Sequence, residues 1–230
     1  MNKILILTAS IGSGHIKAAE AVETELRRLL PDAEITTVDF MARRISRIHC
    51  FMKDFYLMML AFVPNLYDVF YKLSGGSSGG TLVQNAFAWV MMPAMKKLVR
   101  RYEPDLVLCT HPFPEGAASL LRRHHEEHYR LATVMTDYSL HQIWLYPAVD
   151  RYYMATEEMR MGMIGRGFAV NTLRVSGIPV AGTLQEMTAK AAVRHAMAIP
   201  EGQPAVLLMG GGLGLGGIES NLRDLEKIEK

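Results

Sequence analysis

The sequence KILILTASIGSGH, residues 3–15, decides the fold class of this chain. Its apolar run over 3–9 predicts a short buried strand, and its glycines predict a turn directly after that strand. Apolar residues at helical spacing follow over 16–30, and a second β-like run covers 34–40. The stretch therefore predicts a unit of strand, glycine turn, helix and strand.

The same alternation returns further along the chain. The patterns predict strands over 105–110, 130–136, 151–155 and 173–175, and helices over 115–128 and 157–165. Alternating elements with buried apolar strands predict an α/β fold, a Rossmann-like parallel sheet with helices on both faces. Because ligands of such sheets bind beyond the carboxyl ends of the strands, we expect the functional residues directly after each strand.

Composition excludes several classes of protein. Of the 230 residues 50% are hydrophobic and 21% are charged, which excludes a disordered chain. The formal net charge of +2 provides no broad basic field, so we expect no nucleic-acid partner. The two cysteines have no zinc-site spacing, so we expect no metal and a reducing, cytoplasmic location. No stretch reaches the roughly 20 apolar residues of a membrane-spanning helix.

The segment 43–102 interrupts the alternation. It is helical in pattern and rich in Met and aromatic residues; a flexible Ser/Gly link over 74–80 divides it, and Pro64 and Pro93 predict broken helices. Its apolar stretches are flanked by basic residues, which suits helices that lie in a membrane interface. The alternative is that its Met and aromatic side chains simply pack on the sheet as core. The candidate membrane-surface residues are Arg43, Arg44, Arg47, Trp89, Lys96, Lys97, Arg100 and Arg101.

A further pair of elements begins after residue 202. The pattern predicts a strand over 205–209, a glycine-dense loop over 210–217 and a helix over 218–230, which repeats the opening of the chain. We therefore expect one domain over 1–200, with an insertion at about 43–102, and the start of a second domain over 201–230. A lone strand and helix cannot form a core of their own.

The loop between the first strand and the first helix is a candidate ligand site. The helix N-terminus offers free N–H groups and a positive dipole end. Gly12 and Gly14 fit part of a dinucleotide fingerprint, but Lys17 stands where that motif needs a small residue. His15 is a candidate general base, because a neutral imidazole at this position can accept a proton from a hydroxyl. The alternative is a histidine that only caps the helix.

Other polar residues follow neighbouring strands. His111 follows the strand over 105–110, and Asp137 and His141 follow the strand over 130–136, so all three should face the same crevice as His15. Asp137 would orient a histidine or a ligand hydroxyl, or would serve only as a turn residue. The cluster HHEEH over 124–128 has His125 where a metalloprotease motif needs Glu, so we interpret it as a solvated helix face.

Several motifs together resemble one known family. They are LTASIGSGH over 7–15, CTHP over 109–112, VMTDYSLHQIW over 134–144, YMAT over 153–156 and VSGIPV over 175–180. The ordered set is similar to the N-terminal domain of diacylglycerol glycosyltransferases, including bacterial diglucosyldiacylglycerol synthases and plant monogalactosyldiacylglycerol synthases. That family is related to the lipid II-forming glycosyltransferase of cell-wall synthesis. The resemblance spans nearly the whole chain.

The resemblance implies a GT-B fold of two facing Rossmann-like halves, with the lipid acceptor on the N-terminal half and the nucleotide sugar on the other. It implies that the enzyme transfers a hexose from a UDP-sugar to diacylglycerol with inversion, and that it needs neither a cofactor nor a metal. It also implies a peripheral enzyme that binds anionic lipid at the cytoplasmic side of the cell membrane. His15 matches the family's proposed base. The other implied residues are Asp137 in catalysis, Gly12, Ser13, Gly14, His111, Pro112, His141 and Trp144 in substrate binding, and Gly210, Gly211, Gly212 and Gly214 in a donor-diphosphate loop.

The chain departs from the family's pattern at its C-terminal end. The donor half is absent beyond its first strand and loop, so we expect either a fragment of a longer enzyme or an acceptor half that works with a separate donor-domain chain. Two other classes remain open. One is a non-catalytic lipid-binding module, and the other is a nucleotide-binding oxidoreductase that uses Gly12 and Gly14.

Overall fold

The computed structural model describes residues 2–42, 78–125, 128–182, 189–209 and 217–227. Within them, six parallel strands form a sheet in the order β2-β1-β3-β4-β5-β6. The strands are β1 (Lys3–Thr8), β2 (Glu34–Asp39), β3 (Leu106–Cys109), β4 (Arg130–Val134), β5 (Arg151–Met154) and β6 (Leu173–Val175). The strand order reverses at β1, which has β2 on one side and β3 on the other. The carboxyl ends of β1 and β3 are therefore the switch point at which ligands of open α/β sheets bind.

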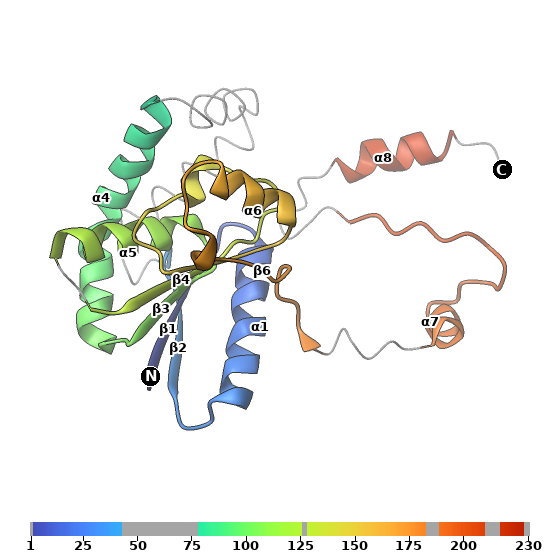
Figure 1. Ribbon diagram of the computed structural model, residues 1–230. Helices are drawn as coiled ribbons and strands as arrows, with labels where there is room; N and C mark the ends of the chain where they lie inside the picture. Colours follow the sequence, from blue (N-terminus) through green and yellow to red (C-terminus); the bar gives the residue numbers. More distant parts are fainter. Residues whose placement is uncertain (1, 43–77, 126–127, 183–188, 210–216, 228–230) are drawn as a thin grey trace.

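Helices cover both faces of this sheet (Figure 1). On one face lies α1 (Ser13–Leu29), and on the other lie α4 (Ser78–Tyr102), α5 (Pro112–His125) and α6 (Glu157–Ile164). Two short 3-10 helices, η1 (Gln142–Trp144) and η2 (Val170–Thr172), lie in the connections on either side of β5. The predicted α/β fold with helices on both faces is confirmed, and the element bounds differ from the expected ones by a few residues.

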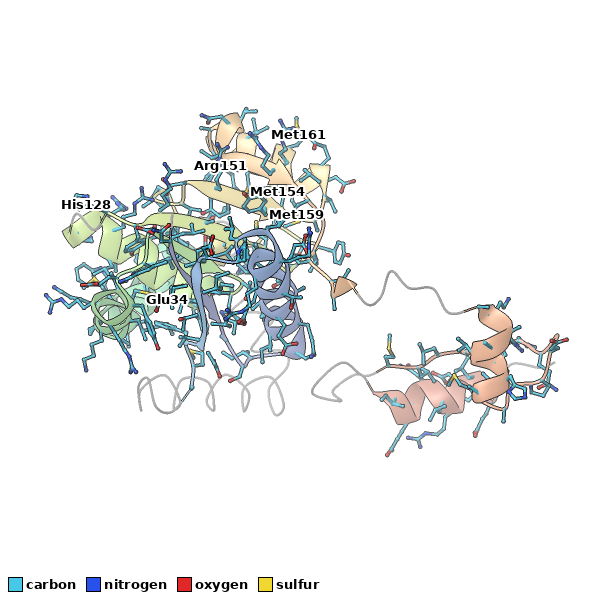
Figure 2. All side chains as sticks on the ribbon, turned by 90° about the horizontal axis from the view of Figure 1, so that it is seen from below. Glu34, His128, Arg151, Met154, Met159 and Met161 are labelled. Atoms are coloured by element: carbon cyan, nitrogen blue, oxygen red, sulfur yellow. The ribbon has the colours of Figure 1, made fainter. Side chains whose placement is uncertain are left out.

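Alternate residues of each strand supply two separate cores, as the pleat of a strand requires. Leu5 and Leu7 of β1 pack with β3, β4 and β5 under α4, α5 and α6, while Ile4 and Ile6 pack under α1. Met154 of β5 and Met159 of α6 are buried in the larger core, whereas Met161, on the outer side of α6, is 56% exposed (Figure 2).

Helix α4 corrects two expectations for the segment 43–102. It runs through Pro93, where the sequence predicted a break, and it begins at Ser78, inside the predicted Ser/Gly link. Pro93 is exposed. A proline has no N–H to donate to the carbonyl four residues earlier, here that of Trp89, so α4 lacks one backbone hydrogen bond at this turn.

The inner face of α4 is ordinary core. Met91 and Met95 are fully buried, with Ala88, Leu98 and Val99 on the same side of the helix. The alternative that the Met side chains of this segment pack on the sheet as core is thus confirmed for Met91 and Met95. Arg43, Arg44, Arg47 and Pro64 lie outside the described residues.

The C-terminal part of the chain also differs from the prediction. The strand expected over 205–209 is wrong, because these residues join none of the described strands and Val206, Leu207 and Met209 are 69%, 77% and 78% exposed. An extended segment becomes a strand only when a neighbour satisfies its backbone groups. The predicted helix over 218–230 is present as α8 (Ile218–Leu225), preceded by α7 (Lys190–Ala196), and neither helix has a buried residue (Figure 1).

Candidate functional site

A glycine turn places His15 at the switch point of the sheet. Gly12, at the N-cap of α1, has φ +85° and ψ +148°, a conformation that side-chain-bearing residues rarely adopt. The helix begins one residue later at Ser13, and Gly14 has open space where a Cβ would stand. The N-terminal turn of α1, with His15 in it, therefore lies beside the ends of β1 and β3.

Two threonines at the ends of neighbouring strands hold His15. Its Nδ1 lies 2.9 Å from the carbonyl oxygen of Thr110, just after β3, and 2.6 Å from Oγ1 of Thr136, just after β4. The Thr110 hydroxyl donates in turn to the backbone carbonyl of His15 at 2.9 Å. The start of α1 is therefore fastened to the carboxyl ends of two other strands.

The environment keeps His15 neutral. Burial lowers its pKa below the ordinary value, against the smaller opposing effects of the Thr110 hydrogen bond and the Asp137 charge. A histidine with a lowered pKa is unprotonated at neutral pH, which a general base must be. The histidine predicted as a base thus has a state that suits the role.

His111 lies directly against His15. Their ring centroids are 4.4 Å apart with the planes at 64°, and His111 is only 4% exposed. Its Nδ1 accepts the backbone N–H of Phe113 at 3.1 Å, which leaves its ring hydrogen on Nε2. Burial, reinforced by the neighbouring His15, holds the pKa of His111 well below its ordinary value. The predicted pair of histidines is therefore brought together with both rings neutral.

Asp137 and Trp144 form a second contact beside the histidines. The Trp144 indole N–H donates to Asp137 Oδ2 at 2.6 Å, and Trp144 is fully buried with its ring centroid 6.3 Å from that of His15. The Asp137 carboxylate is thus engaged by the indole, and the ring of His15 is contacted at Nδ1 by Thr110 and Thr136. His141 caps η1 by accepting the N–H of Ile143 at 3.3 Å.

Thr110 and Thr136 were missed by sequence reasoning. Both stand at the ends of β-like runs, where a β-branched side chain is expected for its strand propensity alone. The signal that points to them is their place at the carboxyl ends of adjacent parallel strands.

Pro112, predicted to bind substrate, is the first residue of α5, a position that favours proline.

A buried acid lies beneath the site. Glu115, in the first turn of α5, is fully buried. This burial raises the pKa of its carboxyl well above the usual range, and the hydroxyls of Tyr152 and Thr133 lower it by a smaller amount. Burial therefore favours the protonated form of this carboxyl. At the next position, a Cβ on Gly116 would come within 2.5 Å of Tyr146 Cζ, so the glycine makes room for that buried ring.

The outer side of α4 carries most of the predicted membrane-surface residues. Trp89 and Val90 are each 49% exposed, and the Trp89 ring lies 5.0 Å from that of His124 on α5. Further along the helix Lys97, Arg100 and Arg101 are exposed, while Lys96 is half-buried. An apolar patch is thus followed by a basic one on the solvent side of one helix.

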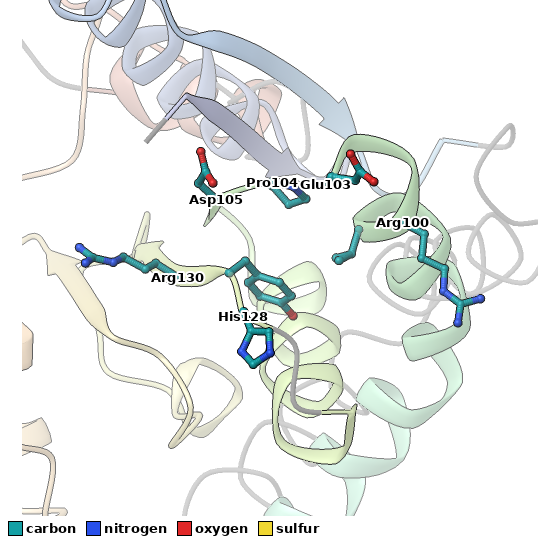
Figure 3. Close-up of a pocket in the computed structure, with 8 residues that line it drawn as sticks. Arg100, Glu103, Pro104, Asp105, His128 and Arg130 are labelled. Carbon is teal, nitrogen blue, oxygen red and sulfur yellow. The ribbon is translucent and has the colours of Figure 1, made fainter.

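Among the described residues, two large cavities lie away from this site. One of about 730 Å³ lies near the amino ends of β3 and β4, and its labelled charged side chains, among them Arg100, Asp105 and Arg130, point away from one another (Figure 3). A ligand site needs converging polar groups, so we assign no ligand to it. The other, about 790 Å³, is a largely apolar groove between α1 and the strands β3 to β5.

The part of the chain that the structure describes holds neither a metal-binding cluster nor a spanning helix. Among the described residues, no group of three or more His, Cys, Asp or Glu side chains could hold a metal ion. Within the same residues no helix is both long enough and apolar enough to cross a bilayer.

The fold and the site define a Rossmann-like α/β domain with a neutral histidine pair at its switch point. The family model described as Monogalactosyldiacylglycerol (MGDG) synthase matches residues 15–180 of this chain. Because that match covers most of the sequence, the chain belongs to the MGDG synthase family, and the predicted family is confirmed.

Curated relatives agree with this assignment. The processive diacylglycerol beta-glucosyltransferase of Staphylococcus saprophyticus is 27% identical over 214 residues, which are 93% of this chain and 53% of that protein. The protein of the same name from Staphylococcus aureus strain Newman is 30% identical over 179 residues, 77% of this chain and 44% of that protein. The chain thus spans about half the length of these relatives.

Among solved structures, the lipopolysaccharide outer core galactosyltransferase WaaB in its apo form matches with a TM-score of 0.44 and 11% identity. The match covers 76% of this chain and 45% of that one.

Proposed function

We propose that this chain is the acceptor-side part of a GT-B glycosyltransferase that moves a hexose from a UDP-sugar to diacylglycerol with inversion. Membership of the MGDG synthase family supports the reaction class. Relatives named as diacylglycerol glucosyltransferases support the acceptor and make UDP-glucose the first donor to test. The observation that carries the proposal is the neutral, half-buried His15 held at the switch point of the sheet.

In this mechanism His15 is the general base. Its Nε2 takes the proton of the acceptor hydroxyl while the hydroxyl oxygen attacks the anomeric carbon of the sugar. The new glycosidic bond forms on the face opposite the breaking bond to the UDP oxygen, and UDP leaves with that electron pair. The Thr110 carbonyl and the Asp137 charge both favour protonated His15, so they stabilise the imidazolium as it forms.

The residues around His15 supply the acceptor site. We assign substrate binding to Gly12, Ser13 and Gly14, because the N-terminal turn of α1 offers backbone N–H groups beside open space at Gly14. The remaining predicted binding residues form the walls or their supports, with His111 and Trp144 near His15, Pro112 at the start of α5 and His141 at the cap of η1.

The donor would be held by a second half. We assign residues 1–200 to the acceptor domain and 201–230 to the beginning of the nucleotide-sugar-binding domain. The proposed donor-diphosphate loop, Gly210, Gly211, Gly212 and Gly214, lies outside the described residues. The rest of the donor half would come from a longer form of this chain or from a separate chain. An intact-mass measurement on the native protein distinguishes these, since this chain is 25.7 kDa.

We further propose that the outer side of α4 lies on anionic lipid at the cytoplasmic face of the cell membrane. Trp89 and Val90 would enter the interface, and Lys96, Lys97, Arg100 and Arg101 would meet the lipid headgroups, each worth about 1 kcal/mol near an anionic surface. Arg43, Arg44 and Arg47 belong to the same proposed surface. This arrangement would hold the domain on the bilayer surface without a spanning helix.

The test is transfer of radiolabelled glucose from UDP-glucose to diacylglycerol in anionic vesicles, with the native-length protein. His15→Gln should lower kcat by about 10²–10⁴-fold. His128→Gln is the matched control, because His128 is exposed at the other end of the sheet. Retained transfer in His15→Gln would refute the base assignment and favour a non-catalytic lipid-binding module. Binding of a nicotinamide cofactor in place of UDP-glucose would favour the oxidoreductase.

A further inference from the structure

We propose that Thr136, together with the Thr110 carbonyl, is a positioning residue that fixes the ring hydrogen of His15 on Nδ1 and leaves the lone pair on Nε2. The catalytic consequence rests on the proposed function, since only a base needs that lone pair. The tautomer itself is a property of this chain and is testable without any transfer reaction.

The contacts around Nδ1 favour a hydrogen on that nitrogen. A carbonyl oxygen can only accept, so the 2.9 Å contact between Nδ1 and Thr110 O requires a hydrogen on Nδ1. Thr136 Oγ1, at 2.6 Å from the same nitrogen, then accepts a second branch of that N–H. The Thr136 hydroxyl hydrogen has its own acceptor in Thr110 O at 3.4 Å. With the hydrogen on Nδ1, the Nδ1–H, the Thr110 hydroxyl and the Thr136 hydroxyl each have an acceptor, and Nε2 keeps its lone pair.

Other polar groups near His15 do not compete for Nδ1. The Asp137 carboxylate accepts the Trp144 indole N–H at 2.6 Å, and His111 uses its own Nδ1 to accept from the backbone. Thr110 is fully buried, and His15 and Thr136 are half-buried. Because hydrogen bonds are stronger where the local dielectric is low, this placement favours one tautomer of His15 over the other.

Both threonines are held by the sheet. The strands β3 and β4 pair in register, with Cys109 opposite Thr133, which brings the residues after each strand to the same edge. The reciprocal bond from the Thr110 hydroxyl to the His15 carbonyl, 2.9 Å, fixes the backbone of the histidine against the same edge. The ring and its two acceptors are therefore positioned by separate, rigid attachments.

Substitution of Thr136 isolates the effect of the hydroxyl. Thr136→Val keeps the β-branched shape and removes the acceptor, whereas Thr136→Ser keeps the hydroxyl and removes a methyl group. Thr8→Val is the matched control, because Thr8 Oγ1 is buried near the same edge and has no hydrogen-bond partner among the described residues. If Thr136→Val fails to fold, Thr136→Ala removes the same acceptor with less risk of a clash.

The first experiment is ¹⁵N NMR of the imidazole rings in the 230-residue chain labelled at histidine, with the His15 signals assigned by their loss in His15→Gln. We expect a protonated Nδ1 and an unprotonated Nε2 in the wild type, in Thr136→Ser and in Thr8→Val. In Thr136→Val we expect a mixture of the two tautomers and a lower His15 pKa, because an acceptor of the N–H is lost. A wild-type His15 with its hydrogen on Nε2, or a Thr136→Val ring identical to wild type, would overturn the proposal.

The second experiment measures transfer in the native-length protein. Thr136→Val should lower kcat about tenfold with little change in KM, as expected for the loss of one hydrogen bond, and Thr136→Ser should restore it. An unchanged kcat in Thr136→Val would refute the catalytic part of the proposal. Absence of transfer in the wild type would instead refute the proposed function, and the NMR result would still decide the tautomer.

Discussion

The contact between Asp137 and Trp144 makes a sharp prediction about a residue that the sequence suggested for catalysis. Trp144 is fully buried, so its indole N–H has no access to water once the carboxylate is removed. A hydrogen bond to a charged group contributes roughly 1.5–3 kcal/mol to stability, and leaving a buried N–H without an acceptor costs a similar amount. The two figures describe the same broken bond, so they are not added. We expect Asp137→Ala to lower the free energy of unfolding by about 2 kcal/mol. Asp137→Asn keeps a carbonyl acceptor and should cost about half as much.

The assay is urea unfolding of the chain followed by circular dichroism, together with tryptophan emission. The chain has two tryptophans, so Trp89→Phe leaves Trp144 as the sole emitter. In that background Asp137→Ala should shift the Trp144 emission to longer wavelength and increase its quenching by acrylamide. Asp32→Ala, at an exposed turn, is the control and should change stability by less than about 0.5 kcal/mol.

Two results would contradict this reasoning. If Asp137→Ala costs less than about 0.5 kcal/mol and leaves the Trp144 emission unchanged, the hydrogen bond does not hold the indole. If the variant keeps full stability but loses transfer, Asp137 acts directly on the substrate, as the sequence suggested.

Three further predictions concern the core and the surface. Gly116→Ala should lower the free energy of unfolding by about 3 kcal/mol in urea titrations, because its Cβ would overlap the buried Tyr146 ring, whereas Gly14→Ala should cause no such loss. Between the ordinary pKa of a glutamate and the raised pKa of Glu115, the native state binds more protons at this residue than the unfolded state, so the contribution of Glu115 to stability should fall as pH rises, opposite in sign to that of His15 and His111. Glu115→Gln should abolish that fall when unfolding is compared at about pH 5 and pH 8. Trp89→Ala should weaken sedimentation with anionic vesicles, and equal binding in the variant and wild type would exclude Trp89 from the lipid surface.

The sequence predicted the sheet and the place of the site because both depend on local patterns. Runs such as 4–7 have the apolar content of buried strands, and the rule for parallel sheets brought His15, His111 and Asp137 to one edge. The roles of side chains within that edge depend on which neighbour each one reaches. No pattern distinguishes an Asp that accepts from an indole from one that orients a histidine.

The misses have a common physical origin, since each depends on tertiary contacts. Pro93 stays helical because both flanking turns of α4 bury apolar side chains such as Met91 and Met95. The run 205–209 has strand composition but no described strand beside it. An acid in the first turn of a helix is usually exposed at the positive dipole end, so the burial of Glu115 had no sequence signal.

The switch point of the sheet also determines when the site can exist during synthesis of the chain. The bonds of the His15 ring to Thr110 and Thr136 span 95 and 121 residues, so the histidine is translated long before its partners. Closing such long loops is entropically costly until β1 and β3 pair, and contacts of this range form slowly in folding chains. A nascent chain that stops before residue 136 has the glycine turn and the imidazole but nothing to hold the ring. The site is therefore a late product of folding, and its appearance reports that the sheet has closed from β1 to β4.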